Sequence, residues 1–438
     1  MVQSRTRKYH KEVETSLRRH ERSVSSYLSL FGFQGQSWAF ILSDAMILTQ
    51  CACCAAPLPH LAKQCSRCKT RYCGPACQKQ HWEGGGHDLL CKKIKKGGGA
   101  EQYNADKKFV AAVATAAEEC AEATKGQTCY ICTEAVHRRT KEGLVRGCAC
   151  RGTAGFAHVS CLVEQVKILC DEAEANNLDF KDFKPRWDRW SSCSLCEQSY
   201  HGVVKCALGW ACWKTYLGRN SEQDFTIRLA AMTELGNGLF SAQAAAEALV
   251  VHKAQVVAYA RNPPSSDQID LPYLGALSNV ANCFAQLGRE EEAQVIRRMV
   301  LAKERSFYGD GHIEPIMTAA NIANAMVQCK KPSAKKYAEI REFTREWVSI
   351  AQSSGLGDHH ITNRIKEAYA YGIYRDPAAS LDDVREGVTI LEDVDRSYRQ
   401  ILGKDHPVSA HTRASLVYVK GRLAHARVIA EIKLRRKL

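Results

Sequence analysis

Long apolar runs are missing from this sequence of 438 residues. The most apolar early stretch, residues 38–48, has 11 residues and contains Asp44, whereas a membrane-spanning helix needs about 20 largely uncharged residues. The basic first residues are not followed by the apolar core and cleavage site of a secretory signal. These absences predict no membrane span and a cytosolic or nuclear location.

Motifs of small-molecule enzymes are also missing. The sequence has no phosphate-binding loop and no Ser-His-Asp arrangement, and the glycine runs at Gly84 and Gly97 have the composition of loops. We therefore expect no small-molecule substrate and no catalytic side chain.

Cysteine is nearly missing from the second half of the chain and abundant in the first. Of 21 cysteines, 17 lie between Cys51 and Cys196, and only Cys283 and Cys329 follow Cys212. In a chain that is not exported, dense and regularly spaced cysteines hold metal ions more often than they form disulfides. The distribution predicts zinc-binding modules in the first half and another architecture in the second.

The net charge of +14 comes from basic residues that are spread over segments 5–22, 92–108 and 433–437, with acidic residues between many of them. Charge of this kind is typical of solvated faces and tails. A nucleic-acid partner is therefore not expected.

The segment 51–91 contains four pairs of potential metal ligands. The pairs are Cys51/Cys54, Cys65/Cys68, Cys73/Cys77 and His87/Cys91. A two-residue gap lets a tight turn direct both sulfurs at one ion, and a three-residue gap places two ligands on one face of a helical turn. Eight ligands predict two tetrahedral sites, and the spacing alone leaves open which pairs share an ion.

This segment resembles a MYND zinc finger, including its His81-Trp82 pair. The resemblance implies interleaved pairs, so that Cys53 and His81 are spare. The implied ligand sets are Cys51, Cys54, Cys73 and Cys77 for one zinc ion, and Cys65, Cys68, His87 and Cys91 for the other. The resemblance also implies a module that binds proline-containing peptides at Gln78 and Trp82, and the alternative is a purely structural zinc knot.

Eight further ligands lie between residues 129 and 196. The segment 148–162, CACRGTAGFAHVSCL, resembles the RING-CH (RINGv) family over its most diagnostic stretch. The ligand sets that this resemblance implies are Cys129, Cys132, His158 and Cys161 for one zinc ion, and Cys148, Cys150, Cys193 and Cys196 for the other.

All four expected zinc ions are structural, because four protein ligands leave no open position at which a water is activated. Metal binding then contributes folding free energy, on the order of 10–16 kcal/mol per site in small finger peptides. Zinc removal is expected to unfold the first 200 residues.

RING-CH domains belong to a family of ubiquitin ligases, which implies docking of a ubiquitin-conjugating enzyme and positioning of its thioester beside a substrate amine, without a covalent intermediate. Ile131, Trp187 and Trp190 match the docking surface, with packing around the zinc sites as their alternative role. Glu197 stands where many active RING ligases carry a basic residue, and it favours a second hypothesis. In that hypothesis the chain is a non-enzymatic scaffold, and both stay open.

Helical patterning takes over from about Phe225, with a repeat of 42 residues that aligns Leu235, Leu277 and Ala319. The segment 277–293 resembles a tetratricopeptide repeat of the kinesin-light-chain type. The resemblance implies four or five helix pairs, with Gly288 at the end of a first helix.

Two polar patterns accompany the repeat. Four asparagines recur on one face of the expected first helices, where they either bind an extended peptide or link the repeats by hydrogen bonds. They are Asn279, Asn282, Asn321 and Asn324. A second spacing, of 47 residues, relates His312, His359 and His406. These histidines are expected at structural turns rather than metal sites, with Asp405 capping a helix that starts at Pro407.

The patterns predict a multi-domain protein with two small zinc-stabilised α+β modules followed by an all-α helical-repeat solenoid. The expected parts are a basic segment (1–50), a MYND-type finger (51–91), a linker or helix (92–124), a RING-CH-type finger (125–200), a connector (201–224) and the repeats (225–438). The expected function is that of a RING-CH-type ubiquitin ligase or ligase-like adaptor, whose finger and repeats recruit protein partners.

Overall fold

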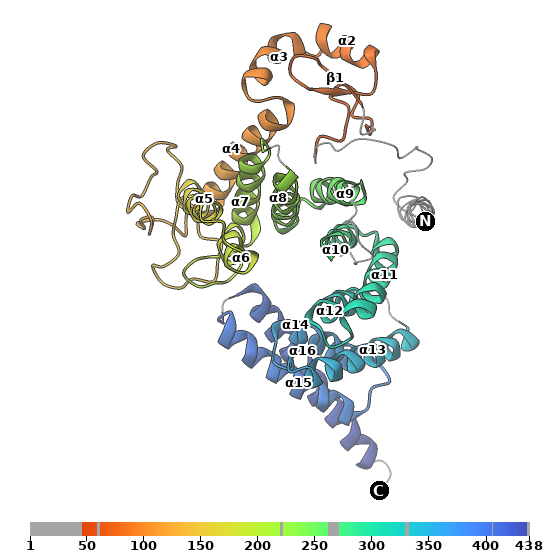
Figure 1. The fold of residues 1–438 in the computed structure, drawn as a ribbon. Coiled ribbons are helices and arrows are strands. Elements are labelled where there is room, and N and C mark those ends of the chain that lie inside the picture. The colour runs from red at the N-terminus through yellow and green to blue at the C-terminus, as the bar shows by residue number, and fades with distance from the viewer. Residues whose placement is uncertain are drawn as a thin grey trace, which may run out of the picture.

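The computed structural model describes residues 46–58, 62–219, 222–261, 271–328, 333–404 and 406–435. The expected basic segment up to residue 45, the helix cap at Asp405 and Cys329 lie outside the described residues. Small cysteine-rich regions come first and helices follow, so the described part is mostly helical (Figure 1). Within it, no helix is both long and apolar enough to cross a membrane.

The first cysteine-rich region consists of a hairpin and two short helices. Strands β1 (Lys63–Gln64) and β2 (Arg71–Tyr72) pair antiparallel, and α2 (Pro75–Glu83) and α3 (His87–Lys96) follow. Gly86 turns the chain from α2 to α3 with a φ of 72°, which a residue with a side chain rarely adopts. The buried cluster of this region is small and consists mainly of cysteines.

The second cysteine-rich region surrounds α5 (Val159–Ala175) and continues through α6 (Phe180–Trp187) and the 3-10 helix η1 (Asp188–Trp190). Helix α5 starts directly after His158 and carries Cys161 in its first turn. Strand pairing here is limited to isolated bridges, such as the one between Val145 and Ala157. The ligands therefore lie mostly on turns that no sheet holds in place.

Two long helices connect the cysteine-rich regions to the rest of the molecule. Helix α4 (Ala100–Cys120) packs against α7 (Gly202–Tyr216), which packs in turn against α8 (Glu222–Ser241). Residues 201–224 were expected as a connector, but α7 is a core helix that contributes buried residues to two hydrophobic clusters. A Cβ at Gly209 would lie 2.7 Å from the carbonyl oxygen of Glu234, so glycine permits the close approach of α7 and α8.

The helices after residue 221 pack in sequence order, each against the next (Figure 1). Their bounds are α8 (Glu222–Ser241), α9 (Ala245–Arg261), α10 (Leu271–Gln286), α11 (Glu290–Tyr308), α12 (Ile313–Val327), α13 (Ala334–Ser353), α14 (His360–Tyr374), α15 (Leu381–Ile401) and α16 (Pro407–Arg435). The described residues thus form four helix pairs and a final helix, as the repeat predicts. Gly288 follows the end of α10 with a φ of 77°, also as expected.

The 42-residue spacing places Leu235, Leu277 and Ala319 in α8, α10 and α12, and all three side chains are buried. The same spacing continues from Asn321 to the buried Asn363 of α14, a member that the sequence analysis did not include.

The periodic histidines mark helix starts, which confirms their structural role. The ring Nδ1 atoms of His312 and His359 accept hydrogen bonds from the first turns of α12 and α14. The Nδ1 atom of His406 lies 3.3 Å from the backbone nitrogen of Val408, and α16 begins at Pro407 as expected.

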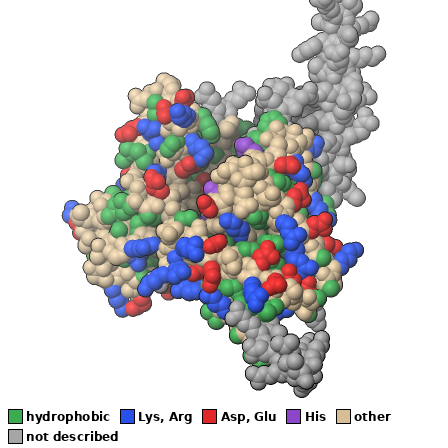
Figure 2. Space-filling view, turned by 90° about the horizontal axis from the view of Figure 1, so that it is seen from below, with side chains coloured by type: hydrophobic (Ala, Val, Ile, Leu, Met, Phe, Trp, Pro, Cys, Tyr) green, Lys and Arg blue, Asp and Glu red, His purple; other side chains and the backbone are tan. Residues whose placement is uncertain are grey.

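The helical half curves back toward the second cysteine-rich region. The rings of His201 and His406 meet edge to face with their centroids 6.5 Å apart. A cavity of about 1020 Å³ lies between residues 197–201 and helices α14, α15 and α16. The face seen in Figure 2 shows histidine side chains beside a hollow in the surface.

Candidate metal centres

Four clusters of cysteine and histidine lie in the first half of the chain. Within each cluster the four ligand atoms lie within 4.8 Å of one another. The clusters are Cys51, Cys54, Cys73 and Cys77; Cys65, Cys68, His87 and Cys91; Cys129, Cys132, His158 and Cys161; and Cys148, Cys150, Cys193 and Cys196. These sets have the interleaved composition that the two resemblances imply, and each can bind a zinc ion.

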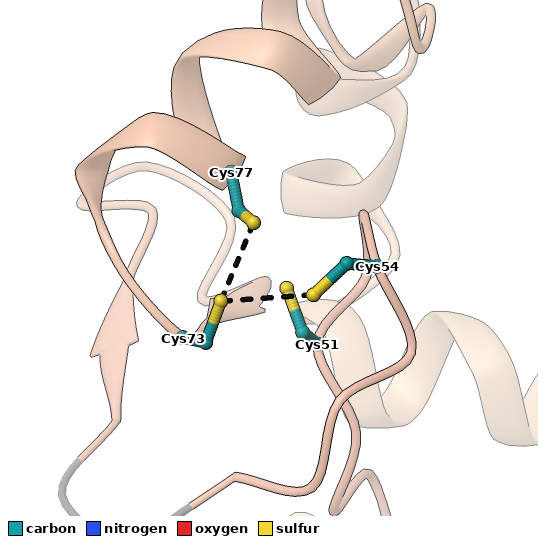
Figure 3. Close-up of side chains that lie close together, drawn as sticks. All are labelled: Cys51, Cys54, Cys73 and Cys77. Atoms are coloured by element: carbon teal, nitrogen blue, oxygen red, sulfur yellow. Dashed lines mark hydrogen bonds between the residues drawn. The ribbon is translucent and has the colours of Figure 1, made fainter.

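The sulfur separations fit a tetrahedral zinc ion. A Zn–S bond of about 2.3 Å places two sulfurs of a tetrahedron about 3.8 Å apart. In the first cluster the sulfur of Cys73 lies 3.7 Å from that of Cys54 and 3.3 Å from that of Cys77 (Figure 3). In the second cluster the sulfurs of Cys65 and Cys91 are 3.8 Å apart.

The two histidine ligands present different ring nitrogens. The Nε2 atom of His87 lies 3.4 Å from the sulfur of Cys68, and the Nδ1 atom of His158 lies 3.4 Å from the sulfur of Cys132. His81 stands outside the clusters, because its Nδ1 atom lies 3.0 Å from the hydroxyl of Tyr72. Cys53, Cys120, Cys170, Cys206 and Cys212 also lie outside them.

The Cys-x-x-Cys pairs share one backbone turn. In each turn the fourth residue after the first cysteine donates its N–H to the carbonyl of that cysteine, over 2.8–3.0 Å, and has a φ between 57° and 65°. These fourth residues are Ala55, Lys69, Thr133 and Glu197. The repeated turn directs both sulfurs of each pair to one side, so the short spacing alone sets the ligand geometry.

The sulfurs of the fourth cluster cannot all ionise without a cation. A hydrogen bond from Cys148, together with backbone N–H groups, lowers the pKa of Cys193 to about 4. Burial and the charge of the neighbouring Cys193 sulfur raise the pKa of Cys150 to about 12. Because one thiolate suppresses ionisation of the next, a divalent ion is needed to hold four thiolates together. The donor set therefore fits zinc.

The prediction that Trp187 and Trp190 form a docking surface is wrong. Their side chains are 9% and 1% exposed, and their rings pack against that of Tyr216 with centroids 5.1 Å and 6.0 Å away. The two tryptophans instead anchor α6 and η1 to α7. Both side chains therefore pack inside the molecule, which is the alternative role that the sequence analysis gave them.

Ile131 is exposed and has a counterpart that the sequence analysis missed. Ile131 and Leu195 are 37% and 51% exposed and occupy the same position in two zinc-binding turns. In each turn their backbone nitrogen lies 3.4 Å from the sulfur of the first cysteine. Their neighbours Tyr130 and Ser194 are linked by a hydrogen bond of 3.1 Å between hydroxyls, so the side chains of the two turns are in direct contact. Leu195 could have been predicted from the sequence, because the segments CYIC (129–132) and CSLC (193–196) both carry an apolar residue directly before the second cysteine.

A groove of about 630 Å³ runs from Ile131 along α5, where Ile168 and Leu169 contribute apolar surface. Its rim is charged through Arg138, Glu164 and other side chains. The second cysteine-rich region thus offers an apolar strip that is bordered by polar groups.

The remaining predicted partner-binding residues lie elsewhere. Gln78 is half-buried and Trp82 is 41% exposed, both on α2. The Oδ1 atom of Asn282 accepts from Arg297 over 3.2 Å, and that of Asn321 accepts from Arg364 over 2.8 Å.

The bond between Asn321 of α12 and Arg364 of α14 links two helix pairs, as the inter-repeat alternative predicts, whereas the bond between Asn282 and Arg297 lies within the pair α10–α11. Asn282, Asn321 and Asn324 also line a cavity of about 380 Å³. Asn279 is half-buried and is not among the residues that line this cavity.

The RING-variant domain family (RINGv) matches residues 129–196. The match begins at the first ligand of the second cysteine-rich region and ends at its last. This region is therefore a zinc-binding RING-variant domain, and the first cysteine-rich region is a further candidate zinc-binding module. No curated protein matches the chain.

Proposed function

We propose that the chain is a RING-type ubiquitin ligase of the cytosol or nucleus that docks a ubiquitin-conjugating enzyme on the tips of its RING-variant domain. The observation that carries the proposal is the pair of exposed apolar residues Ile131 and Leu195 on two linked zinc-binding turns, with Ile131 lining the groove along α5. Apolar anchors that are surrounded by polar groups are typical of protein interfaces.

The ligase role needs no catalytic side chain of its own. Each zinc cluster has four protein ligands, so the domain acts by holding enzyme, thioester and substrate amine in one geometry. The rigid turns around the zinc ions suit this task, because backbone hydrogen bonds fix the position of both tips.

The test is discharge of ubiquitin from a panel of conjugating enzymes by the full-length zinc-loaded protein. Ile131→Ala should reduce discharge roughly thirtyfold, since truncating an interface anchor commonly costs about 2 kcal/mol or more. Leu195→Ala should act in the same direction. Val136→Ala is the matched control, because Val136 is 53% exposed and lies outside the groove.

The zinc content of all three variants should stay at four ions per chain, since none of the residues is a ligand. If the parent protein discharges no enzyme of a broad panel while it holds four zinc ions, the ligase proposal fails. Equal loss with Val136→Ala would also contradict it.

The second candidate is a non-enzymatic scaffold with the same zinc-binding modules. Glu197 favours it, because this acidic residue follows the last zinc ligand, where many active RING ligases carry a basic residue. Glu197 also lines the cavity that faces α14, α15 and α16. A scaffold predicts no discharge by the parent and no effect of the tip substitutions, so the same assay separates the two.

In both functions the other modules recruit protein partners. We assign the first cysteine-rich region to the MYND type, with peptide binding near Gln78 and Trp82, because its ligand sets interleave as that resemblance implies. We assign α8–α16 to a tetratricopeptide-like solenoid that binds an extended peptide. The support is the cavity where Asn282, Asn321 and Asn324 meet the guanidinium groups of Arg297 and Arg364.

A further inference from the structure

Helix α3 carries exposed apolar and basic side chains on one face. The helix turns its two zinc ligands and Ile94 inward. Lys92 and Lys93 stand three and four residues after Leu89, and Lys96 stands four and three residues after them, so the four side chains share one side of the helix. All four are exposed, and Leu89 is 81% exposed. We call these four residues the α3 outer face.

The region around this face is strongly basic. Residues 46–99 contain nine lysines and arginines but only two acidic residues. The net charge of these side chains is therefore +7. Two zinc ions contribute +4 and their seven thiolate ligands contribute −7, so the zinc-loaded region keeps a net charge of +4. The lysines of α3 have no ion-pair partner among the described residues. By contrast, the molecular face in Figure 2 mixes acidic and basic side chains.

Further apolar groups lie at the N-terminal end of α3. Trp82 and Leu90 are 41% and 42% exposed. The Trp82 ring lies 5.7 Å from the ring of His87, the first residue of α3. The apolar groups are thus gathered at the start of the helix.

Basic groups gather at the other end. The carbonyl of Cys68 accepts a hydrogen bond of 2.9 Å from the N–H of Ala100, which holds the turn with the exposed Arg67 and Lys69 beside the end of α3. The surface therefore changes from apolar to basic along the helix.

We propose that the α3 outer face binds an acidic peptide with an apolar anchor, which packs on Trp82 and Leu89 while its carboxylates pair with Lys92, Lys93 and Lys96. This deepens the proposed peptide-binding role of the first cysteine-rich region and rests on it. An α-helix rises about 1.5 Å per residue, so Lys93 and Lys96 lie about 6 Å and about 10 Å beyond Leu89. An extended peptide advances about 3.3 Å per residue, which places its acidic residues two and three positions from the anchor.

The surface fits a peptide better than two other polyanions. A membrane would need a wide apolar face, whereas three lysines share the side of α3 that carries Leu89. Nucleic acid would pair its phosphates with the lysines but would leave the exposed leucines without an apolar partner.

The experiment measures binding of fluorescein-labelled peptides to the full-length zinc-loaded protein by anisotropy. The first probe has a proline-leucine segment followed by glutamates two and three positions further on, and its twin has glutamines instead. The acidic probe should bind at least tenfold more tightly, because several individually weak exposed ion pairs act together. Raising the ionic strength from about 0.05 M to about 0.5 M should remove most of the difference.

Charge reversal locates the site. Lys92→Glu with Lys93→Glu should abolish the preference for the acidic probe and keep four zinc ions, whereas Lys335→Glu, at an exposed position of α13, should change nothing. Leu89→Ser should weaken both probes. Equal binding of the twin probes, or an unchanged preference after charge reversal, would overturn the inference. If neither probe binds, the peptide-binding role itself fails.

Two competitors complete the test. A single-stranded DNA oligonucleotide and vesicles with phosphatidylserine should displace the acidic probe less effectively than the unlabelled peptide does. Stronger displacement by either of them would overturn the inference in favour of that polyanion.

Discussion

The zinc-binding half and the helical half of the molecule are held together by different means. In residues 46–99 the buried cluster has six members, and four of them are cysteines of the zinc clusters. The cluster shared by α11–α14 has eleven members, such as Ile340 and Trp347, and contains no cysteine. A few cysteine and histidine ligands stabilise the fold of the first region, whereas many apolar side chains together stabilise the fold of the second.

This difference sets what each region tolerates. A zinc site loses its geometry when one ligand is removed, because no neighbouring group can replace a thiolate. An apolar core loses stability in proportion to the volume removed and keeps its fold after many conservative exchanges. Removing one zinc ligand should therefore disrupt a whole zinc-binding region, whereas a conservative exchange in the apolar core should lower the stability of the helical half only in part.

Zinc removal should give the largest effect. Chelation should release four zinc ions and unfold the loops of residues 46–99 and 129–201, since each site contributes on the order of 10 kcal/mol to folding. Helices α10–α15 should keep their amide protection, because their clusters contain no zinc ligand. Elemental analysis combined with hydrogen exchange measures both, and loss of protection throughout the helical half would break the comparison.

A single ligand should give the next largest effect. Cys150→Ser removes one ligand of the fourth cluster and should reduce the zinc content from four ions to three. Cys53→Ser should leave the content at four, because Cys53 lies outside the clusters. Equal zinc loss in both variants would contradict the ligand sets described above.

The pairing of neighbouring zinc ligands could be predicted because its geometry is local, whereas the interleaved grouping of these pairs came from the two family resemblances and not from the spacing. Short Cys-x-x-Cys spacing determines a turn, and that turn directs the sulfurs regardless of the remaining fold. The roles of Trp187 and Trp190 could not be predicted in this way. Their burial depends on Tyr216 of α7, a contact between separate elements that the sequence pattern does not contain.

Removal of Trp190 tests the contact between the two halves. Trp190 is 1% exposed and belongs to the cluster that contains α7 and α8, so Trp190→Ala should lower the free energy of unfolding by about 3–5 kcal/mol. The zinc content of the folded variant should stay at four. Chemical denaturation measures the loss, with Trp82→Ala as an exposed control that should change stability by about 0.5 kcal/mol or less.

The helical half could be predicted in outline, because the 42-residue repeat and the glycine at position 288 carry local signals. The arginine partners of Asn282 and Asn321 could not be foreseen. Arg297 lies on the adjacent helix, and Arg364 lies 43 positions beyond Asn321. Only the packing of α10–α14 brings these groups together.

A buried carboxyl should make the stability of the helical half depend on pH. Burial raises the pKa of Glu304 to about 7 from its ordinary value near 4.5. The folded protein then keeps a proton that the unfolded chain loses between these values, so stability falls as the pH rises through this window. The loss amounts to about 3 kcal/mol above pH 7.

Glu304→Gln removes the titrating group. The variant should be more stable than the parent by about 2–3 kcal/mol at pH 8, and the two should be similar near pH 5. Denaturation at both pH values, followed by hydrogen exchange of α11, measures the difference. Glu291→Gln is the control, because Glu291 is exposed on the same helix. A constant difference at both pH values would show that the carboxyl does not titrate in this window.

The smallest expected effect is the loss of a helix-capping histidine in the helical half, which contrasts with the loss of a zinc-binding histidine in the first half. His158 belongs to a zinc cluster, so His158→Ala should remove a zinc ion and unfold the surrounding turns. His312 accepts one hydrogen bond from the backbone of Glu314 and stacks on Tyr308. His312→Ala should therefore cost only about 1 kcal/mol, the usual worth of a helix cap, and His312→Asn should recover part of it because asparagine caps well. Thermal denaturation and zinc analysis measure the three variants. Because the cap contributes to one helix start and holds no metal, the zinc content should stay at four in both His312 variants, and a lower content would assign His312 to a metal site instead.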